Sequence, residues 1–255
     1  MRLKGKTALI TGASRNIGKQ ISLSFAMEGA DLLLNTRKSH HELDVVSAEC
    51  RELGVNVYTA IGDVSEPECV TNIVRDGLET IGKIDILVSN VAIRPHKQLL
   101  DISNEEWLHV LNVNLNSTFY LLKALLPHMI EQRNGSIIAL GGQTAITGRP
   151  KTAAVAASKT GLLGLIRAVA AEMGTYGIRA NMVNPGSTDT ERQHPEWYPE
   201  FQGKKREAPD HLKTIPLKRQ ATVSDIANAC LFLASDDAGY ITGEQLNVVG
   251  GNHMI

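Results

Sequence analysis

The sequence has few cysteines, few aromatic residues and no excess of either charge. Cys50, Cys69 and Cys230 are widely separated and form no C-x-x-C pair. This spacing argues against a disulfide framework or a zinc site and suits free thiols in a reducing compartment. The net charge of −1 argues against nucleic acid or an anionic membrane surface as the main partner. The sequence predicts no bound metal.

Neither a signal peptide nor a membrane span is expected. The first residues, MRLKGK, lead directly into an expected strand and leave no room for a signal peptide. No apolar run reaches the length of a membrane span. We therefore expect a soluble, cytoplasmic protein.

Short apolar runs alternate with longer segments of helical period, a pattern typical of βαβ units and a parallel sheet. The expected strands are 7–11, 31–35, 55–61, 84–89, 136–140, 178–184 and 245–249. The expected helices are 17–29, 41–53, 67–81, 103–133 and 152–173, with Pro127 bending or interrupting the fourth. We predict a single α/β domain over residues 1–255. Its doubly wound, mostly parallel seven-stranded sheet has helices on both faces and is of the Rossmann type.

Residues 186–222 form the one irregular stretch, rich in proline, charge and aromatic residues. A long loop inside a compact domain is usually functional. Trp197, Tyr198 and Phe201 give this stretch apolar surface with which to close. We interpret it as a substrate lid, with a disordered insertion as the alternative.

A glycine-rich turn, TGASRNIG (11–18), follows the first expected strand and opens a helix. Such a turn lets backbone N–H groups meet a pyrophosphate at the positive end of the helix dipole. The strand-to-helix context makes it a strong signal for a dinucleotide site. The candidate contacts within it are Gly12, Ser14, Arg15, Asn16, Ile17 and Gly18.

Four segments resemble the short-chain dehydrogenase/reductase family in order and spacing: TGASRNIG, SNVA (89–92), NVNL (112–115) and NPGSTDT (184–190). Within that family the chain looks most like β-ketoacyl-carrier-protein reductases, and the resemblance spans essentially the whole chain. It implies an oxidoreductase that uses a nicotinamide cofactor and a small-molecule substrate. It also implies cofactor contacts at Asp63, Val64, Asn90, Lys159, Pro185, Gly186, Thr188 and Thr190.

Asn16 departs from the family pattern TGxxxGxG, because it stands at the middle glycine. Asparagine tolerates left-handed backbone angles better than most residues, and its amide could also hydrogen-bond a pyrophosphate. We therefore expect cofactor binding here to be modified and not lost.

The end of the second expected strand predicts which cofactor is used. Family members that prefer NAD place an acid there to accept from the ribose 2′-OH, whereas this chain has Thr36. Arg37 and Lys38 follow, and Arg15 lies in the glycine-rich turn, so three cations converge where a 2′-phosphate would lie. We predict NADP(H) in preference to NAD(H), with a solvated basic patch as the alternative.

The reacting centre departs further from the family. Asn114 and Lys159 match its catalytic asparagine and lysine, but Gly142 and Val155 stand where it has serine and tyrosine. Neither replacement can give a proton to a carbonyl oxygen, so ordinary ketone reduction should be impaired. Lys159 is the best remaining candidate acid, and a purely structural ribose clamp is the alternative.

Several loop residues could complete the substrate pocket. Arg94 and His96 lie after the fourth strand, at the carboxyl edge where ligands bind in such sheets. Arg94 could bind a carboxylate or phosphate of the substrate. The alternative is that it is an ordinary surface residue without a ligand. The substrate-pocket candidates are Arg94, His96, Gly142, Gln143 and Val155, with Thr144 beside them and His194, Tyr198 and His211 on the expected lid.

Three functions stay open at this point. The first is an NADP(H)-dependent reductase of a small carbonyl, imine or conjugated substrate, with altered proton delivery. The second is a non-redox lyase or dehydratase that uses its bound cofactor structurally. The third is a catalytically silent, cofactor-binding subunit. The complete cofactor turn together with Asn114 and Lys159 favours the first, whereas the two replaced side chains favour the third.

Two long helices predict self-association. The helix from Asn104 carries a broad apolar stripe, and the helix from Thr152 is small or apolar on nearly every side. One sheet face cannot cover a helix that is apolar on more than one side. We expect a homotetramer or a homodimer, with burial inside the monomer as the alternative.

Overall fold

The computed structural model describes residues 1–191, 194–197, 212 and 214–254. Its centre is a seven-stranded sheet in the order β3-β2-β1-β4-β5-β6-β7, in which every neighbouring pair is parallel. The strands are β1 (Thr7–Thr11), β2 (Asp31–Thr36), β3 (Val57–Ile61), β4 (Ile86–Ser89), β5 (Gly135–Leu140), β6 (Ile178–Pro185) and β7 (Gln245–Val248). The predicted sheet is confirmed.

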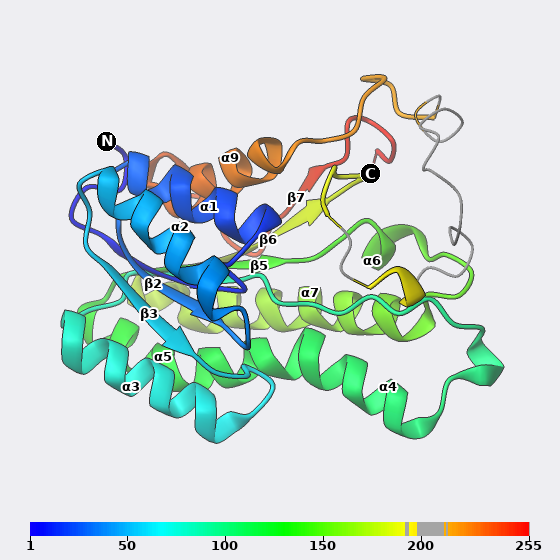
Figure 1. Ribbon diagram of the computed structural model, residues 1–255, viewed down its shortest axis with the longest axis horizontal. Helices are drawn as coiled ribbons and strands as arrows, with labels where there is room; N and C mark the ends of the chain where they lie inside the picture. Colours follow the sequence, from blue (N-terminus) through cyan, green and yellow to red (C-terminus); the bar gives the residue numbers. More distant parts are fainter. Residues whose placement is uncertain (192–193, 198–211, 213, 255) are drawn as a thin grey trace.

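Helices cover both faces of the sheet, also as predicted (Figure 1). One face carries α1 (Asn16–Met27), α2 (His40–Glu52) and α9 (Val223–Ala234). The other carries α3 (Pro67–Ile81), α5 (Ser117–Gln132) and α7 (Ala153–Met173). Two short helices, α4 (Asn104–Leu111) and α6 (Thr144–Thr147), lie beyond the carboxyl ends of the strands.

The inner strands are buried along their whole length because helices cover both of their faces. Every residue of β1, β4 and β5 is buried, as expected for continuous apolar runs in a parallel sheet. Successive residues of β1 enter opposite cores: Leu9 packs with one set of side chains and Ile10 with the other. Each face of the sheet therefore has its own hydrophobic core.

The fourth predicted helix is divided in two. Helix α4 ends at Leu111, and a π-helical turn over Asn112–Asn116 separates it from α5. Pro127 does not interrupt the helix, because α5 continues through it. Short π-helical turns inside helices occur frequently at functional sites, and this one carries Asn114.

Helix α9 lies outside the helices expected from the pattern of apolar residues. Its start is nevertheless marked in the sequence, because Thr222 and Asp225 cap it reciprocally through side chain and backbone. The helix packs against α1 and the central strands. It completes the cover of one sheet face.

One helical stretch, Ala153–Tyr176, is long and apolar enough to cross a membrane by length and composition alone. In the structure it packs against β6, α4 and α6. The core helix of a globular protein meets the same criterion.

The order of the strands positions the site. The chain builds outward from β1 through β2 to β3 and then returns to add β4 on the other side of β1. In doubly wound sheets, ligands bind outside the carboxyl ends of the strands at the point where this direction changes.

Candidate active site

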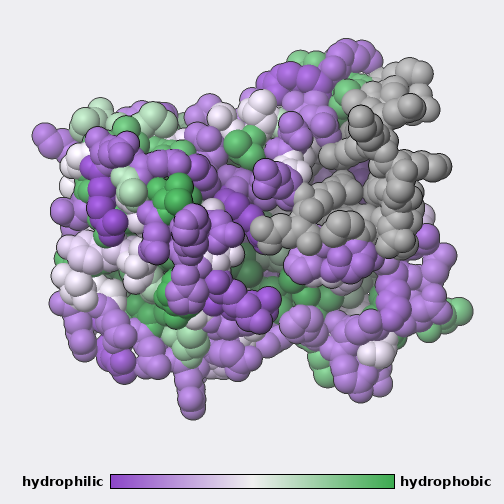
Figure 2. Space-filling view, viewed as in Figure 1, coloured by the Kyte–Doolittle hydropathy of each residue, from purple (hydrophilic) through white to green (hydrophobic). Residues whose placement is uncertain are grey.

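One cavity of about 1500 Å³ lies at this edge of the sheet. Pockets for single small ligands usually measure roughly 300–1000 Å³, so this one has room for a dinucleotide and a substrate. A hollow with polar side chains around it is visible near the middle of the space-filling view (Figure 2). The structure brings every predicted cofactor contact to the cavity wall: Gly12, Ser14, Arg15, Asn16, Ile17, Gly18, Arg37, Lys38, Asp63, Val64, Asn90, Lys159, Pro185, Gly186, Thr188 and Thr190.

The glycine-rich turn brings the main chain to the cavity without side chains in the way. Gly12 has a φ of 63°, in the left-handed region that favours glycine. A Cβ at Gly18 would overlap the carbonyl oxygen of Gly12, so α1 can begin this close to β1 only with glycine there. The Asn90 amide donates to the carbonyl oxygens of Thr11 and Gly12, at 3.1 and 3.2 Å. The turn is therefore fixed where the first N–H groups of α1 can meet an anion.

Asn16 adopts the left-handed backbone conformation that the sequence predicts, with a φ of 48°. Its side-chain amide has a different partner from the pyrophosphate suggested by the sequence. Asn16 Oδ1 accepts from the N–H of Glu191, and Nδ2 donates to the carbonyl oxygen of Glu191, both at 3.1 Å. The two hydrogen bonds join the start of α1 to the segment that follows β6.

Three cations line the cavity beside the end of β2. Thr36 there is buried and carries no charge. Arg37 Nη1 lies 3.3 Å from Asp63 Oδ2, and Lys38 lines the same wall. The buried Nη1 atom of Arg15 has no hydrogen-bond partner among the described residues, and burial lowers the pKa of this guanidinium. A partly desolvated, unsatisfied guanidinium is stabilised by an anion bound beside it.

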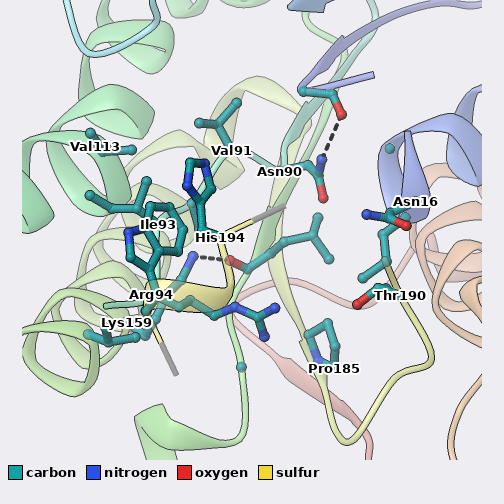
Figure 3. A pocket seen from close by; sticks show the side chains of 18 of the residues that line it. Asn16, Asn90, Val91, Ile93, Arg94, Val113, Lys159, Pro185, Thr190 and His194 are labelled. Atoms are coloured by element: carbon teal, nitrogen blue, oxygen red, sulfur yellow. Dashed lines mark hydrogen bonds between the residues drawn. The ribbon is translucent and has the colours of Figure 1, made fainter. Parts of the chain in front are cut away.

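Lys159 lies on the wall of the same cavity, at the carboxyl end of β5. Its side chain is buried, and Nζ donates to the carbonyl oxygen of Leu140 at 2.6 Å (Figure 3). It has no ion pair with any residue that the structure describes. Burial, and to a smaller extent the charge of Arg94, lower the pKa of Lys159 to about 7. At neutral pH the amine is therefore divided between its charged and neutral forms.

Asn114 lies behind the cavity wall and is not among the residues that line it. Its Oδ1 accepts from the Ile93 N–H at 2.8 Å, and its Nδ2 donates to the Ile93 carbonyl at 2.9 Å and to Ser158 Oγ at 3.1 Å. The side chain thus fixes the loop after β4 against the start of α7. In this structure Asn114 positions Ile93 and, beside it, Arg94.

Gly142 and Val155 both line the cavity, as predicted for the substrate pocket. The Gly142 N–H donates to Asn184 Oδ1 at 3.0 Å. Val155 is buried and packs against Val110 and Trp107. The described residues of the cavity wall include no tyrosine. The reacting end is therefore apolar where a hydroxyl would be needed to protonate a carbonyl oxygen.

The remaining predicted pocket residues meet here from separate loops. Arg94, His96, Gln143 and Thr144 line the cavity. The backbone N–H of His96 donates to the Trp197 carbonyl at 2.9 Å, which ties the loop after β4 to the segment after β6. His194 lines the cavity and stacks on Trp197 with ring centroids 4.0 Å apart. Its Nδ1 atom lies 2.7 Å from Glu196 Oε1. Tyr198, Phe201 and His211 lie outside the described residues.

Two basic residues of the described cavity wall, His109 and Arg149, were not expected from the sequence. His109 lines the wall from α4, four residues before Val113, which also lines it. Helical spacing places these two residues on one face, and that spacing could have identified His109. Arg149 comes from the irregular loop between α6 and α7, where no periodic signal exists. Among the described residues no group of His, Cys, Asp and Glu is arranged to hold a metal ion.

Comparisons with known proteins give the same architecture. Residues 12–253 match the family model described as enoyl-(acyl carrier protein) reductase. The 3-oxoacyl-[acyl-carrier-protein] reductase FabG of Thermotoga maritima is 37% identical over 251 residues, which cover 98% of this chain and 99% of that protein. The protein of the same name from Staphylococcus epidermidis is 34% identical over 250 residues, with 98% and 99% covered.

Solved structures are similar over the same length. Levodione reductase is 30% identical and superposes with a TM-score of 0.92, covering 98% of both chains. Carveol dehydrogenase from Mycobacterium avium, solved in complex with NAD, is 29% identical with a TM-score of 0.92 and the same coverage.

Proposed function

Because the chain belongs to the short-chain dehydrogenase/reductase family and is an oxidoreductase of that type, we propose that it is an NADP(H)-dependent reductase with altered proton delivery. Its substrate is a small carbonyl, imine or conjugated compound, and Lys159 supplies the proton. The observation that carries this proposal is a single cavity that joins the glycine-rich turn, the cations after β2 and the buried amine of Lys159.

The residues present fit NADP(H). The glycine-rich turn lines the cavity, and its backbone N–H groups at the start of α1 suit a pyrophosphate. The unsatisfied Nη1 of Arg15 suits the 2′-phosphate, with Arg37 and Lys38 on the same wall. When bound, the cofactor would supply a hydride to the substrate.

Lys159 can hold and release a proton at the reacting end. A pKa of about 7 means that both forms of the amine are populated near neutral pH, which is the condition for an efficient general acid. Its Nζ is fixed by Leu140, so the proton is held at a defined position. Neither Gly142 nor Val155 has a hydroxyl group that could donate a proton in place of Lys159.

The altered wall selects the substrate. General acid catalysis contributes typically about 100- to 10,000-fold, and a ketone needs that proton on its oxygen. A neutral imine needs its proton at nitrogen, and a conjugated C=C bond needs its proton at the α-carbon, so neither depends on a hydroxyl beside a carbonyl oxygen and both can take the proton from Lys159. Substrates of these kinds are therefore favoured over simple ketones.

The replaced serine and tyrosine also support a second candidate, a cofactor-binding subunit without catalytic activity. A non-redox lyase or dehydratase is a third. Binding of NADPH without turnover of any acceptor would favour these two. In either case we place the protein in the cytoplasm as a homo-oligomer, which the separate free cysteines and the apolar helices α4 and α7 support.

The test is a fluorescence titration with NADPH followed by NADPH oxidation with a panel of ketones, imines and enones. The proposal predicts saturable NADPH binding and turnover of an imine or enone that Lys159→Met reduces strongly. Absence of NADPH binding, or turnover unaffected by Lys159→Met, would contradict it.

A further inference from the structure

Positive charge gathers at the reacting end of the cavity. Arg94, Arg149 and Lys159 line it, together with His96, His109 and His194. The two carboxylates on the described wall have other neighbours: Asp63 pairs with Arg37, and the charge of Glu191 acts on Arg15. No acidic side chain on the described wall therefore neutralises Arg94 or Lys159.

Arg94 is an exposed residue on the wall of the cavity. It makes no hydrogen bond and no ion pair with a described residue, although its backbone position is fixed, since Asn114 holds the neighbouring Ile93 by both main-chain groups. Its charge acts on Lys159 and contributes to the lowered pKa of that amine. Two cations held near each other without a counter-charge repel, and an anion placed between them removes the repulsion.

Apolar and polar side chains share the rest of the cavity wall. Val91, Ile93 and Val113 lie near Lys159 (Figure 3), and Leu140 and Val155 line the same cavity, as do the polar Gln143, Thr144 and Thr152. The apolar part of such a wall binds a hydrophobic body. A guanidinium beside it selects a planar or tetrahedral oxyanion, because its N–H groups form a fork that matches two oxygens.

We propose that the substrate carries an oxyanion, a carboxylate or a phosphate, which Arg94 binds while an apolar body lies against the wall around Lys159. This inference rests on the proposed reductase function only in calling the bound molecule a substrate. The oxyanion site itself does not depend on that function. Arg149, whose Nη2 lies 3.4 Å from Gln143 Oε1, is a further guanidinium on the same cavity.

The oxyanion site can be tested by equilibrium binding, without turnover. The probes are trans-cinnamate, phenyl phosphate and the neutral trans-cinnamamide, titrated by calorimetry at constant ionic strength. The protein is saturated with NADP⁺, so that the cations near β2 are occupied, and a parallel series uses protein without cofactor. The variants are Arg94→Gln and, as a matched control, Lys97→Gln. Lys97 lies in the same loop, but its Nζ pairs with Glu106 at 2.7 Å and it does not line the cavity.

At least one of the two anions should bind about tenfold or more tightly than the amide, because a charge-assisted hydrogen bond is worth roughly twice a neutral one. Preference for cinnamate assigns a carboxylate, and preference for phenyl phosphate assigns a phosphate. Arg94→Gln should remove most of the preference and leave the amide unchanged, whereas Lys97→Gln should preserve it.

The proposal is overturned if the anions and the amide bind equally, if Arg94→Gln leaves the preference intact, or if no probe binds at up to about 10 mM, where even a weak Kd would register. Failure of the reductase function has a different signature. An Arg94-dependent anion preference in protein that binds no NADP⁺ would contradict the proposed function and support the oxyanion site.

Discussion

Asn16 and Glu191 lie 175 residues apart in the chain and are joined by two hydrogen bonds of 3.1 Å. The amide of Asn16 makes both, and Glu191 contributes only its main-chain N–H and C=O. Both residues line the cavity, and Figure 3 shows Asn16 beside Thr190. The contact connects the turn that would hold a pyrophosphate to the segment after β6, so a bound dinucleotide would be enclosed between them.

Loss of this contact should speed the release of cofactor. In Asn16→Gly the backbone keeps its left-handed φ without strain, but both hydrogen bonds are lost. Because each net hydrogen bond contributes about 1 kcal/mol, we expect NADPH to dissociate about fivefold faster or more in stopped-flow displacement. Glu191→Gln is the control, since it preserves the main-chain partners. Equal dissociation rates for Asn16→Gly and the unmutated protein would show that the contact does not retain cofactor.

Arg15 should determine the choice between the two nicotinamide cofactors. We expect NADPH to bind at least about tenfold more tightly than NADH, and Arg15→Gln to weaken NADPH alone, because its unsatisfied Nη1 would lose a charged partner. Lys19→Gln is the matched control, since Lys19 pairs with Glu49 at 2.7 Å. Equal affinities of the unmutated protein for NADPH and NADH would refute the assignment.

Ketone reduction should rise when the family's hydroxyl groups are restored. A Cβ at Gly142 would meet nothing closer than Thr144 Oγ1 at 3.7 Å, so serine fits there. The double variant Gly142→Ser/Val155→Tyr should reduce ketones about tenfold faster or more, at a stability cost of about 1–3 kcal/mol for overpacking. Gly142→Ser/Val155→Phe adds similar bulk without a phenol. A similar gain from the phenylalanine variant would rule out proton transfer as its cause.

The sequence was sufficient for the sheet and the cofactor turn because short, largely apolar runs alternate with helical segments and the turn lies between a strand and a helix. It also indicated that Asn16 tolerates a left-handed backbone conformation, which is a local property. The sequence could not predict the partner of the Asn16 amide, because that partner is the main chain of Glu191, which lies in a distant, irregular segment. The break in the fourth helix occurs at Asn112–Asn116 and not at Pro127. Asn114 in this turn hydrogen-bonds the loop after β4, and a tertiary contact of this kind is not visible in the local sequence.

Self-association should depend on the exposed apolar face of α4 and α5. Leu108 on α4 is 63% exposed, and Phe119 on α5 is 47% exposed. Exposed large side chains on neighbouring helices indicate an interface. We expect light scattering to give two or four times the chain mass of 27.6 kDa, and Phe119→Lys to lower it. A stable mass near 27.6 kDa in the unmutated protein would contradict this expectation.

In the proposed reaction, a substrate accepts hydride from bound NADPH while Lys159 gives the proton. This reaction is tested most directly by the single-turnover rate of deuteride transfer from C4-deuterated NADPH, measured as a function of pH with the best imine or enone acceptor. Burial lowers the pKa of Lys159 from 10.5 to about 7, so the proton-donating form predominates below that pH. The rate should therefore be constant below pH 7 and fall about tenfold per pH unit above it. Lys159→Met should remove most of the rate together with this pH dependence. A rate that does not change across pH 7, or that survives Lys159→Met, would contradict the account, as would the absence of deuteride transfer to every acceptor tested.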